Sequence, residues 1–88
     1  MRVTVRLFAR LREVAGYEVE DCEVPAGARV ADVWTAIAAR HPVLVPFGGS
    51  WSAAINADFA KMSTPVHDGD EVAFLPPVSG GSGRDTTS

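Results

Sequence analysis

Residues 68–81 read DGDEVAFLPPVSGG, and the rest of the chain is best understood as support for this stretch. An acidic turn comes first, followed by a short apolar strand, two prolines and two adjacent glycines. The prolines block a helix and remove two backbone donors, and the glycines lack a Cβ, so a narrow channel can close around them. Little remains to be buried past Leu75. We therefore expect residues 76–81 to form an extended arm that reaches about 20 Å from the domain.

Composition limits the function classes that the chain can belong to. Its 88 residues suffice for one domain, and the contents of 47% apolar and 22% charged residues are ordinary for a soluble globule. A net charge of −3 without a basic stripe argues against nucleic acid as a partner. No apolar run is long enough to cross a bilayer, and the start has no signal-peptide character. The lone Cys22 excludes an internal disulfide, a four-cysteine zinc site and a cysteine-ligated iron–sulfur cluster. We expect a cytoplasmic protein with no membrane contact.

Alternation of apolar and polar residues predicts five strands. They are expected at residues 2–8, 17–24, 51–57, 59–62 and 71–75. In the second of these, Val19 and Cys22 fall on opposite parities, which predicts a bulge near Asp21. Phe8 falls on the polar side of the first strand: either it tucks under a loop, or it is an exposed aromatic for a partner. The last strand has apolar residues on both faces, which predicts a central position in the sheet.

One helix is clearly indicated, over residues 30–40. Its apolar stripe consists of Val30, Val33, Trp34, Ile37 and Ala38. This stripe places Trp34 in the core and not on a ligand platform. A shorter helix is expected over 9–15. Residues 41–50 contain two prolines and two glycines and are predicted to be a loop. His41 and His67 have no catalytic partner nearby in the sequence, so both are expected to be isolated surface residues, and no metal site is predicted.

The order of elements is strand, short helix, strand, long helix and three further strands. One amphipathic helix must then cover one face of a mixed sheet. This predicts an α+β fold of the β-grasp (ubiquitin-like) class, with a four- to five-stranded sheet covered by one main helix. The final strand would lie centrally beside the first and continue into solvent as the arm.

At this point the sequence resembles a known family. The similar segments are VRLFA (5–9), LRE (11–13), VPAG (24–27), AIN (54–56) and above all DGDEVAFLPPVSGG (68–81). Together they resemble the molybdopterin synthase small subunit, MoaD, and more weakly the related sulfur carriers of the ThiS type. The resemblance extends over residues 2–81. A glycine pair alone is a weak signal, but joined to the preceding run at the end of a ubiquitin-like domain it is specific.

The resemblance implies a carrier chemistry at the end of the arm. In this family an adenylating (MoeB-like) enzyme uses ATP to activate the carboxylate of the last glycine, here Gly81, next to Gly80. The carboxylate becomes a thiocarboxylate. The arm, which includes Pro76, Pro77 and Val78, then enters the large synthase subunit (MoaE-like) and donates sulfur to a pterin precursor. The domain itself would be a co-substrate and not an enzyme, with no bound cofactor or metal.

The resemblance also implies an apolar partner surface at the root of the arm. The matching positions are Phe8, Phe59 and Leu75, and the adenylating enzyme and the large subunit are expected to compete for them. The alternative is that these three residues belong to the core.

One departure from the family concerns residues 82–88. The family typically ends at the second glycine, whereas SGRDTTS follows here, and a peptide bond after Gly81 cannot be adenylated. A protease could remove residues 82–88, the chain could be a binding module without carrier activity, or the tail could be a remnant of a fusion. Two other functions remain open: a sulfur carrier for cysteine, thiamin or tRNA thiolation, and a ubiquitin-like tag or interaction module.

Overall fold

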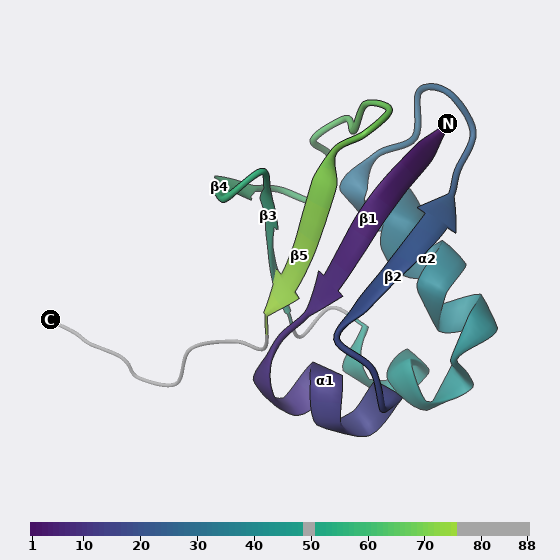
Figure 1. The fold of residues 1–88 in the computed structure, drawn as a ribbon, viewed down its shortest axis with the longest axis vertical. Coiled ribbons are helices and arrows are strands. Elements are labelled where there is room, and N and C mark those ends of the chain that lie inside the picture. Colours follow the sequence, from purple (N-terminus) through teal and green to yellow (C-terminus); the bar gives the residue numbers. More distant parts are fainter. Residues whose placement is uncertain (49–50, 76–88) are drawn as a thin grey trace, which may run out of the picture.

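A five-stranded mixed sheet with one long helix against it forms the body of the molecule (Figure 1). This computed structural model describes residues 1–48 and 51–75. The elements are β1 (Arg2–Leu7), α1 (Ala9–Ala15), β2 (Val19–Glu23), α2 (Val30–Arg40), the 3-10 helix η1 (Pro42–Phe47), β3 (Ser52–Ile55), β4 (Asp58–Ala60) and β5 (Glu71–Leu75). The strand order is β2-β1-β5-β3-β4, in which β1 and β5 are parallel and all other neighbours antiparallel. The predicted β-grasp architecture is confirmed.

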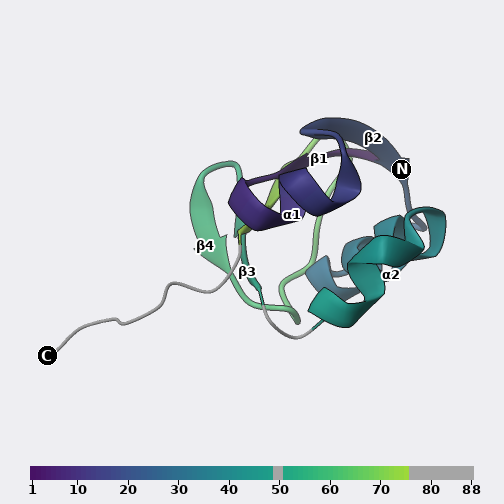
Figure 2. The same cartoon turned by 90° about the horizontal axis from the view of Figure 1, so that it is seen from below.

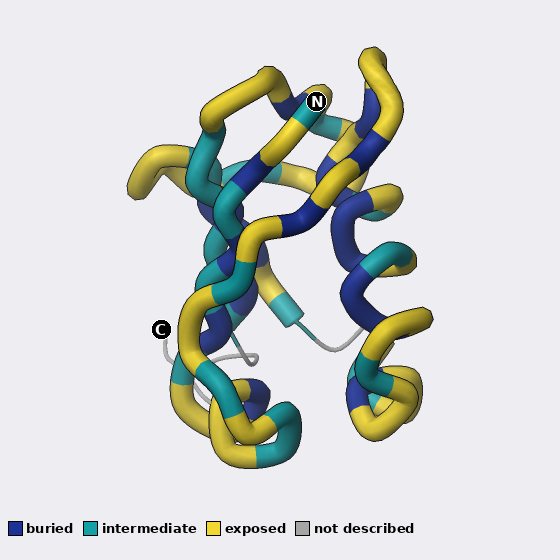
Figure 3. Tube along the Cα trace, turned by 45° about the vertical axis from the view of Figure 1, so that its right-hand side comes forward, coloured by how far each residue is buried: buried dark blue, intermediate teal, exposed yellow. Residues whose placement is uncertain are grey.

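The core lies between α2 and one face of the sheet. The helix turns its buried stripe toward the strands and its exposed residues away from them (Figure 3). Trp34 is only 7% exposed, as predicted, and its ring meets Phe74 edge-on with centroids 5.2 Å apart. Trp51 contacts the same phenyl ring at 4.6 Å. Burial of these large apolar side chains is the main stabilising term of a domain of this size.

β5 is the central strand, as predicted, and the turn before it fixes its position beside β1. The Asp68 carboxylate accepts a hydrogen bond from the Arg2 amide at 2.8 Å, and the Gly69 amide donates to the Arg2 carbonyl, also at 2.8 Å. Gly69 has a φ of +86°, a conformation that favours glycine. Phe74, on the inner face of β5, is completely buried. The residues on the outer face of β5 are only half-buried, although the apolar pattern suggested that this face would be buried as well.

The parallel pairing of β1 and β5 brings their two carboxyl ends to one edge of the sheet. The helix α1 follows β1 at this edge (Figure 2). It ends at Gly16, which adopts the left-handed conformation with φ +82° and donates its amide to the Arg12 carbonyl. The end of β1 therefore lies next to the place where the chain leaves β5 at Leu75.

The predicted bulge near Asp21 is wrong. The β1–β2 register runs without interruption from Arg2 opposite Glu23 to Arg6 opposite Val19. Val19 simply lies on the outer face, and Glu20 takes the inward position. The carboxylate of Glu20 tolerates this because ionic and hydrogen-bond partners from the end of α2 reach it, so charge pairing replaces the apolar contact that the pattern led us to expect.

The loop predicted for residues 41–50 is also partly wrong, because residues 42–47 form η1. Its apolar sequence PVLVPF buries Leu44 completely. The Leu44 amide donates to the His41 carbonyl at 2.9 Å, and the Gly48 amide donates to the Val45 carbonyl at 3.1 Å. A short 3-10 helix tolerates a proline at its start and one near its end, since few amide donors are needed.

Candidate functional site

The face of the sheet turned away from α2, called the open face below, carries a continuous row of side chains across all five strands. Arg6 on β1 lies between Val19 on β2 and Ala73 on β5. Ala73 is opposite Ala54 on β3, and Ala54 is opposite Phe59 on β4. Directly opposite residues on one face have close Cβ atoms. The row therefore brings together residues from distant parts of the sequence.

A shallow hollow of about 360 Å³ lies over the middle of this row. Its lining consists of Arg6, Phe8, Ala54, Ala57, Phe59, Glu71, Ala73 and Leu75. The two alanines at the centre, Ala54 and Ala73, make the middle low because their side chains are short. The larger residues at the ends of the row and on neighbouring positions stand higher around it. The arrangement leaves room for a side chain that none of the described residues provides.

Phe8 reaches the hollow because the alternation of side chains between the two faces continues one residue past the end of β1. Its backbone stays extended, with φ −120° and ψ 153°, and its amide donates to the Phe74 carbonyl at 3.2 Å. Its side chain therefore follows Arg6 on the open face. The next residue, Ala9, has a φ of +50° and starts α1. Phe8 is half-buried, and it is not among the residues that pack against the core.

Phe59 owes its position to a tight hairpin between β3 and β4. Asn56 and Ala57 form the two-residue connection, and both have positive φ, +50° and +75°, as a type I′ turn requires. The Asn56 side chain locks the turn, since it accepts the Glu71 amide and donates to the Asp70 carboxylate, each at 3.0 Å. Phe59 itself is 88% exposed. The alternative that it belongs to the core is therefore wrong.

The hollow has one basic and one acidic residue in its lining. Arg6 Nε lies 3.7 Å from Glu71 Oε2, and both side chains are partly exposed. This is an ion pair without a hydrogen bond, since the distance exceeds the usual 2.7–3.2 Å range. A predominantly apolar hollow thus has a polar margin on the β1 side.

Sequence reasoning found the large residues of this site and missed the small and charged ones. The structure brings the predicted Phe8, Phe59 and Leu75 together around one hollow. Pro76, Pro77, Val78, Gly80 and Gly81, and the tail 82–88, lie outside the described residues. The missed residues are Arg6, Ala54, Ala57, Glu71 and Ala73. The signal that could have found Arg6 was its parity, which it shares with Phe8 on the first strand.

A second polar cluster joins the end of α2 to β2, and it corrects the prediction that His41 is isolated. His41 Nε2 lies 2.8 Å from Glu20 Oε1, and the Arg40 guanidinium lies 2.6 Å from Glu20 Oε2. Burial alone would raise the pKa of Glu20, but the hydrogen bond from His41 and the charge of Arg40 outweigh it, so the pKa lies below its usual range. Burial, and secondarily the Glu20 carboxylate, raise the pKa of the neighbouring Tyr17. His67 is a surface residue, as predicted: its side chain is 78% exposed, and its imidazole Nδ1 lies 3.7 Å from Asp70 Oδ2.

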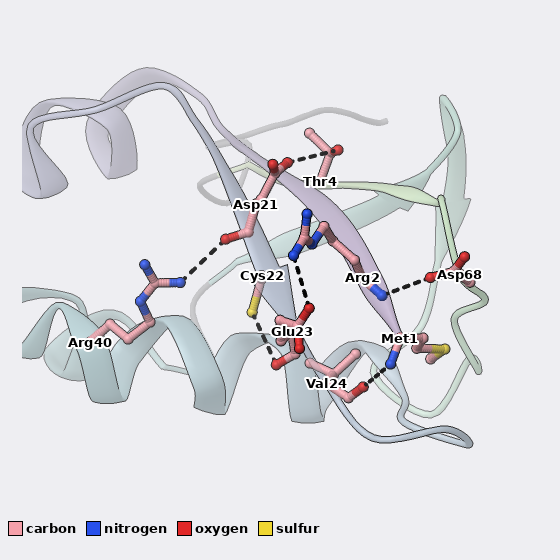
Figure 4. A network of polar contacts seen from close by, with 9 residues as sticks. All are labelled: Met1, Arg2, Thr4, Asp21, Cys22, Glu23, Val24, Arg40 and Asp68. Atoms are coloured by element: carbon pink, nitrogen blue, oxygen red, sulfur yellow. Dashed lines mark hydrogen bonds and ion pairs between the residues drawn. The ribbon is translucent and has the colours of Figure 1, made fainter.

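A larger hollow between β2 and α2, of about 460 Å³, differs from the first because charged residues dominate its lining. It is lined by Arg2, Asp21, Cys22, Glu23, Ala36 and Arg40. Figure 4 shows that its charged groups are already engaged. Arg2 pairs with Glu23 at 3.1 Å, and Arg40 donates to the Asp21 carbonyl at 3.2 Å. These contacts tie the edge strand β2 to β1 and to the helix α2, which is a structural role.

The part of the chain that the structure describes contains no candidate metal site. No group of three or more His, Cys, Asp or Glu residues is placed to hold an ion within residues 1–48 and 51–75. Cys22 is buried, and burial raises the pKa of its thiol. Over the same residues, no helix has the length and apolar character needed to cross a membrane.

Comparison with known proteins places these features in a family. The sequence profile of the ThiS family matches residues 5–81, nearly the whole chain. The chain belongs to the ThiS family. A curated relative of this ThiS-family protein is the molybdopterin synthase sulfur carrier subunit of Chlamydomonas reinhardtii. It is 37% identical over 83 residues, which cover 92% of this chain and 100% of the relative. The resemblance drawn from the sequence is confirmed.

Solved structures agree with the family and the fold. The crystal structure of the small archaeal modifier protein SAMP1 from Haloferax volcanii superposes on this ThiS-family chain with a TM-score of 0.81 and 31% identity, covering 92% of this chain and 100% of the other. The Helicobacter pylori complex of subunits 1 and 2 of molybdopterin-converting factor contains a chain that matches with a TM-score of 0.64 and 28% identity, over 92% and 100% of the two chains.

Proposed function

We propose that this ThiS-family chain is the sulfur carrier subunit of a molybdopterin synthase, acting as a protein co-substrate in molybdenum cofactor biosynthesis. Support comes from the Chlamydomonas relative of that name, which matches over its full length, and from the similar chain in the H. pylori complex. The observation that carries the proposal is structural. Phe8, Phe59 and Leu75 surround one hollow beside the point where the chain leaves β5. An apolar docking surface there would direct residues 76–81 into the partner.

The proposed chemistry takes place at the Gly81 carboxylate. In an activating enzyme this carboxylate attacks the α-phosphorus of ATP, releasing pyrophosphate and forming an acyl-adenylate. A sulfur nucleophile then displaces AMP and leaves a thiocarboxylate. The acyl-adenylate must be kept from water, so a closed channel has to surround the arm. Gly80 and Gly81 suit such a channel because they have no side chain, and Pro76 and Pro77 are residue types that cannot continue a helix.

In this proposal the domain supplies no acid, base or metal ligand to the reaction. It positions the arm, and the large synthase subunit performs the transfer of sulfur to the pterin precursor. The free Cys22 thiol suits the reducing cytoplasm in which we place this process. Because only a free carboxylate can be adenylated, a protease must first hydrolyse the peptide bond between Gly81 and Ser82.

Conversion of the pterin precursor tests the function directly. The chain ending at Gly81, prepared as the thiocarboxylate, should yield molybdopterin when it is mixed with the large subunit and the precursor. The Phe59→Ala form should yield product more slowly at limiting concentration, since it removes an exposed side chain of the docking surface. The full chain should yield none until residues 82–88 are removed, and mass spectrometry after incubation with the activating enzyme and ATP should find adenylate on the trimmed form alone. Failure of the trimmed, thiocarboxylated chain to support conversion would reject the proposal.

A second candidate function is supported by the similarity to SAMP1, whose name describes a modifier protein. In that case the activated Gly81 would form an amide with a lysine of another protein. Proteomic analysis of the source cells distinguishes the two. Peptides that carry a Gly81 remnant on lysine side chains would favour the modifier, and their absence together with precursor conversion would favour the sulfur carrier.

A further inference from the structure

Arg6 combines the lowest exposure among the paired arginines of the domain with an incompletely satisfied charge. Its side chain is 38% exposed, compared with 63% for Arg2, 52% for Arg12 and 53% for Arg40. It is the most buried of the four. Arg40 nevertheless has close contacts with Glu20 at 2.6 Å and with the Asp21 carbonyl at 3.2 Å. The most enclosed of these four side chains therefore lacks the close partners that Arg2 and Arg40 have and, like Arg12, has only a longer ion pair.

The contacts of Arg6 leave its donors available. Its Nε is shielded from water and has no hydrogen-bond partner, and Glu71 is 3.7 Å away. Within residues 1–48 and 51–75, no group accepts a hydrogen bond from the Arg6 side chain. A guanidinium offers five N–H donors in a planar fork that matches a carboxylate. Leaving such donors partly desolvated and unpaired is unfavourable, and a carboxylate from outside the domain would relieve that cost.

The shape of the hollow complements this charge. Ala54 and Ala73 form its low centre, and Phe8, Phe59 and Leu75 stand around it. A large apolar side chain of a partner would fill the space over the two alanines. Arg6 lies beside Ala73 in the same row, so the apolar contact and the charged contact would be made side by side. Such a combination sets the orientation of a partner as well as its affinity.

We propose that Arg6 is a specificity residue of the docking surface, and that the partner presents a carboxylate to Arg6 beside a large apolar side chain over Ala54 and Ala73. This inference rests on the proposed function, which supplies the partner: the large synthase subunit. Glu71 holds the guanidinium near the hollow but does not satisfy it. Arg6 is thus a positioning and recognition residue and takes no part in the sulfur chemistry.

Exchanging the charges of Arg6 and Glu71 distinguishes a role of their ion pair within the domain from a role in recognising the partner. Isothermal titration calorimetry would measure the affinity of the large subunit for the full chain and for its form ending at Gly81. Arg6→Glu should weaken binding by about tenfold to a hundredfold. The exchange Arg6→Glu with Glu71→Arg keeps an internal pair and should unfold at the same urea concentration as the native chain, yet should bind as weakly as Arg6→Glu. Arg2→Glu, on the same strand and face but outside the hollow, should bind within about twofold of the native chain.

Each outcome has a distinct meaning. If the exchanged pair restored both stability and affinity, Arg6 would serve only the domain itself and the inference would fail while the function stood. If neither native form bound the large subunit, the proposed function would fall, and this inference with it. Sedimentation of the chain alone provides a further check, because self-association that Arg6→Glu abolished would make a second copy the occupant and overturn the proposal. An Asp→Arg or Glu→Arg change in the large subunit that rescues Arg6→Glu would identify the carboxylate.

Discussion

The two faces of the sheet are built by the same strands but use their side chains in opposite ways. On the inner face, Val5, Leu7, Val72 and Phe74 are all completely buried. On the open face, the alternate residues of the same strands are charged, small or half-exposed, and Phe59 is 88% exposed. Because successive side chains of a strand point to opposite faces, one sequence can meet both demands.

This difference indicates where stability and function reside. The inner face is complete: helix α2 covers it, and its aromatic residues contact one another. The open face is incomplete, because its apolar side chains surround a hollow that no described residue fills. Changes on the inner face should therefore alter the free energy of unfolding, and changes on the open face should alter binding.

The largest effect is expected from replacing one phenylalanine on each face. Phe74→Ala removes a fully buried ring that contacts Trp34 and Trp51, and it should lower the free energy of unfolding by about 3–5 kcal/mol. For a domain of this size that is a large fraction of the total stability. Phe59→Ala removes an exposed ring and should change the same quantity by less than about 0.5 kcal/mol. Urea denaturation followed by tryptophan fluorescence measures both.

The same two variants sharpen the comparison when binding is measured. Phe59→Ala should weaken binding of the large subunit at least about tenfold, as loss of an aromatic anchor does at other interfaces. Phe59→Leu serves as the matched control, because it keeps an apolar side chain and should recover most of the affinity. A loss of stability in Phe59→Ala comparable to that of Phe74→Ala would contradict the division between the two faces.

A smaller effect is expected at the edge of the inner face, where Glu20 replaces an apolar residue. Glu20→Gln removes the ion pair with Arg40 and weakens the hydrogen bond with His41, and it should cost about 1–2 kcal/mol near pH 7. The pKa of Glu20 is lowered in the folded state, so its stabilising contribution is complete above the unfolded pKa of about 4.3 and disappears as the pH falls through the folded value. The difference between native and variant should therefore shrink below about pH 4.

The control for this experiment is Glu23→Gln on the same strand. Glu23 pairs with Arg2 at 3.1 Å, but its side chain is 75% exposed. Removal of such a surface pair should change the free energy of unfolding by less than about 0.5 kcal/mol at any of these pH values. A Glu20→Gln variant that behaved like Glu23→Gln would show that the cluster does not stabilise the edge of the sheet.

The two faces also explain which features were predictable from the sequence. The stripe of α2 and the apolar run of β5 gave the fold, because burial of a regular face leaves a periodic signal. Phe8, Phe59 and Leu75 were found through a family resemblance, since exposed residues leave no such signal. The arm itself, residues 76–81, was inferred from prolines and glycines and lies outside the described residues.

The errors arose where pairing between distant residues decides the structure. Val19 and Glu20 break the alternation of apolar and polar residues in β2, and this local pattern predicted a bulge. The actual cause is the contact of Glu20 with Arg40 and His41, which lie some twenty positions further along the chain. Arg6 was not among the predicted site residues. Its neighbours Ala73 and Ala54 become known only when the strand order is known.

The smallest effect is expected at Ala57, where the hairpin that presents Phe59 carries backbone strain. Ala57 has a φ of +75°, which costs an L-residue about 1–2 kcal/mol and glycine almost nothing. Ala57→Gly also increases the conformational entropy of the unfolded chain, which offsets part of the gain. We therefore expect the free energy of unfolding to rise by about 0.5–1 kcal/mol. The matched control is Ala36→Gly in the middle of α2, where the same change should destabilise by about 1 kcal/mol. Thermal denaturation of both variants measures the contrast. Ala57 lines the hollow, and the change removes only its methyl group, so a large loss of partner affinity in Ala57→Gly would show that strain in this turn, and not only the position of Phe59, prepares the open face for binding.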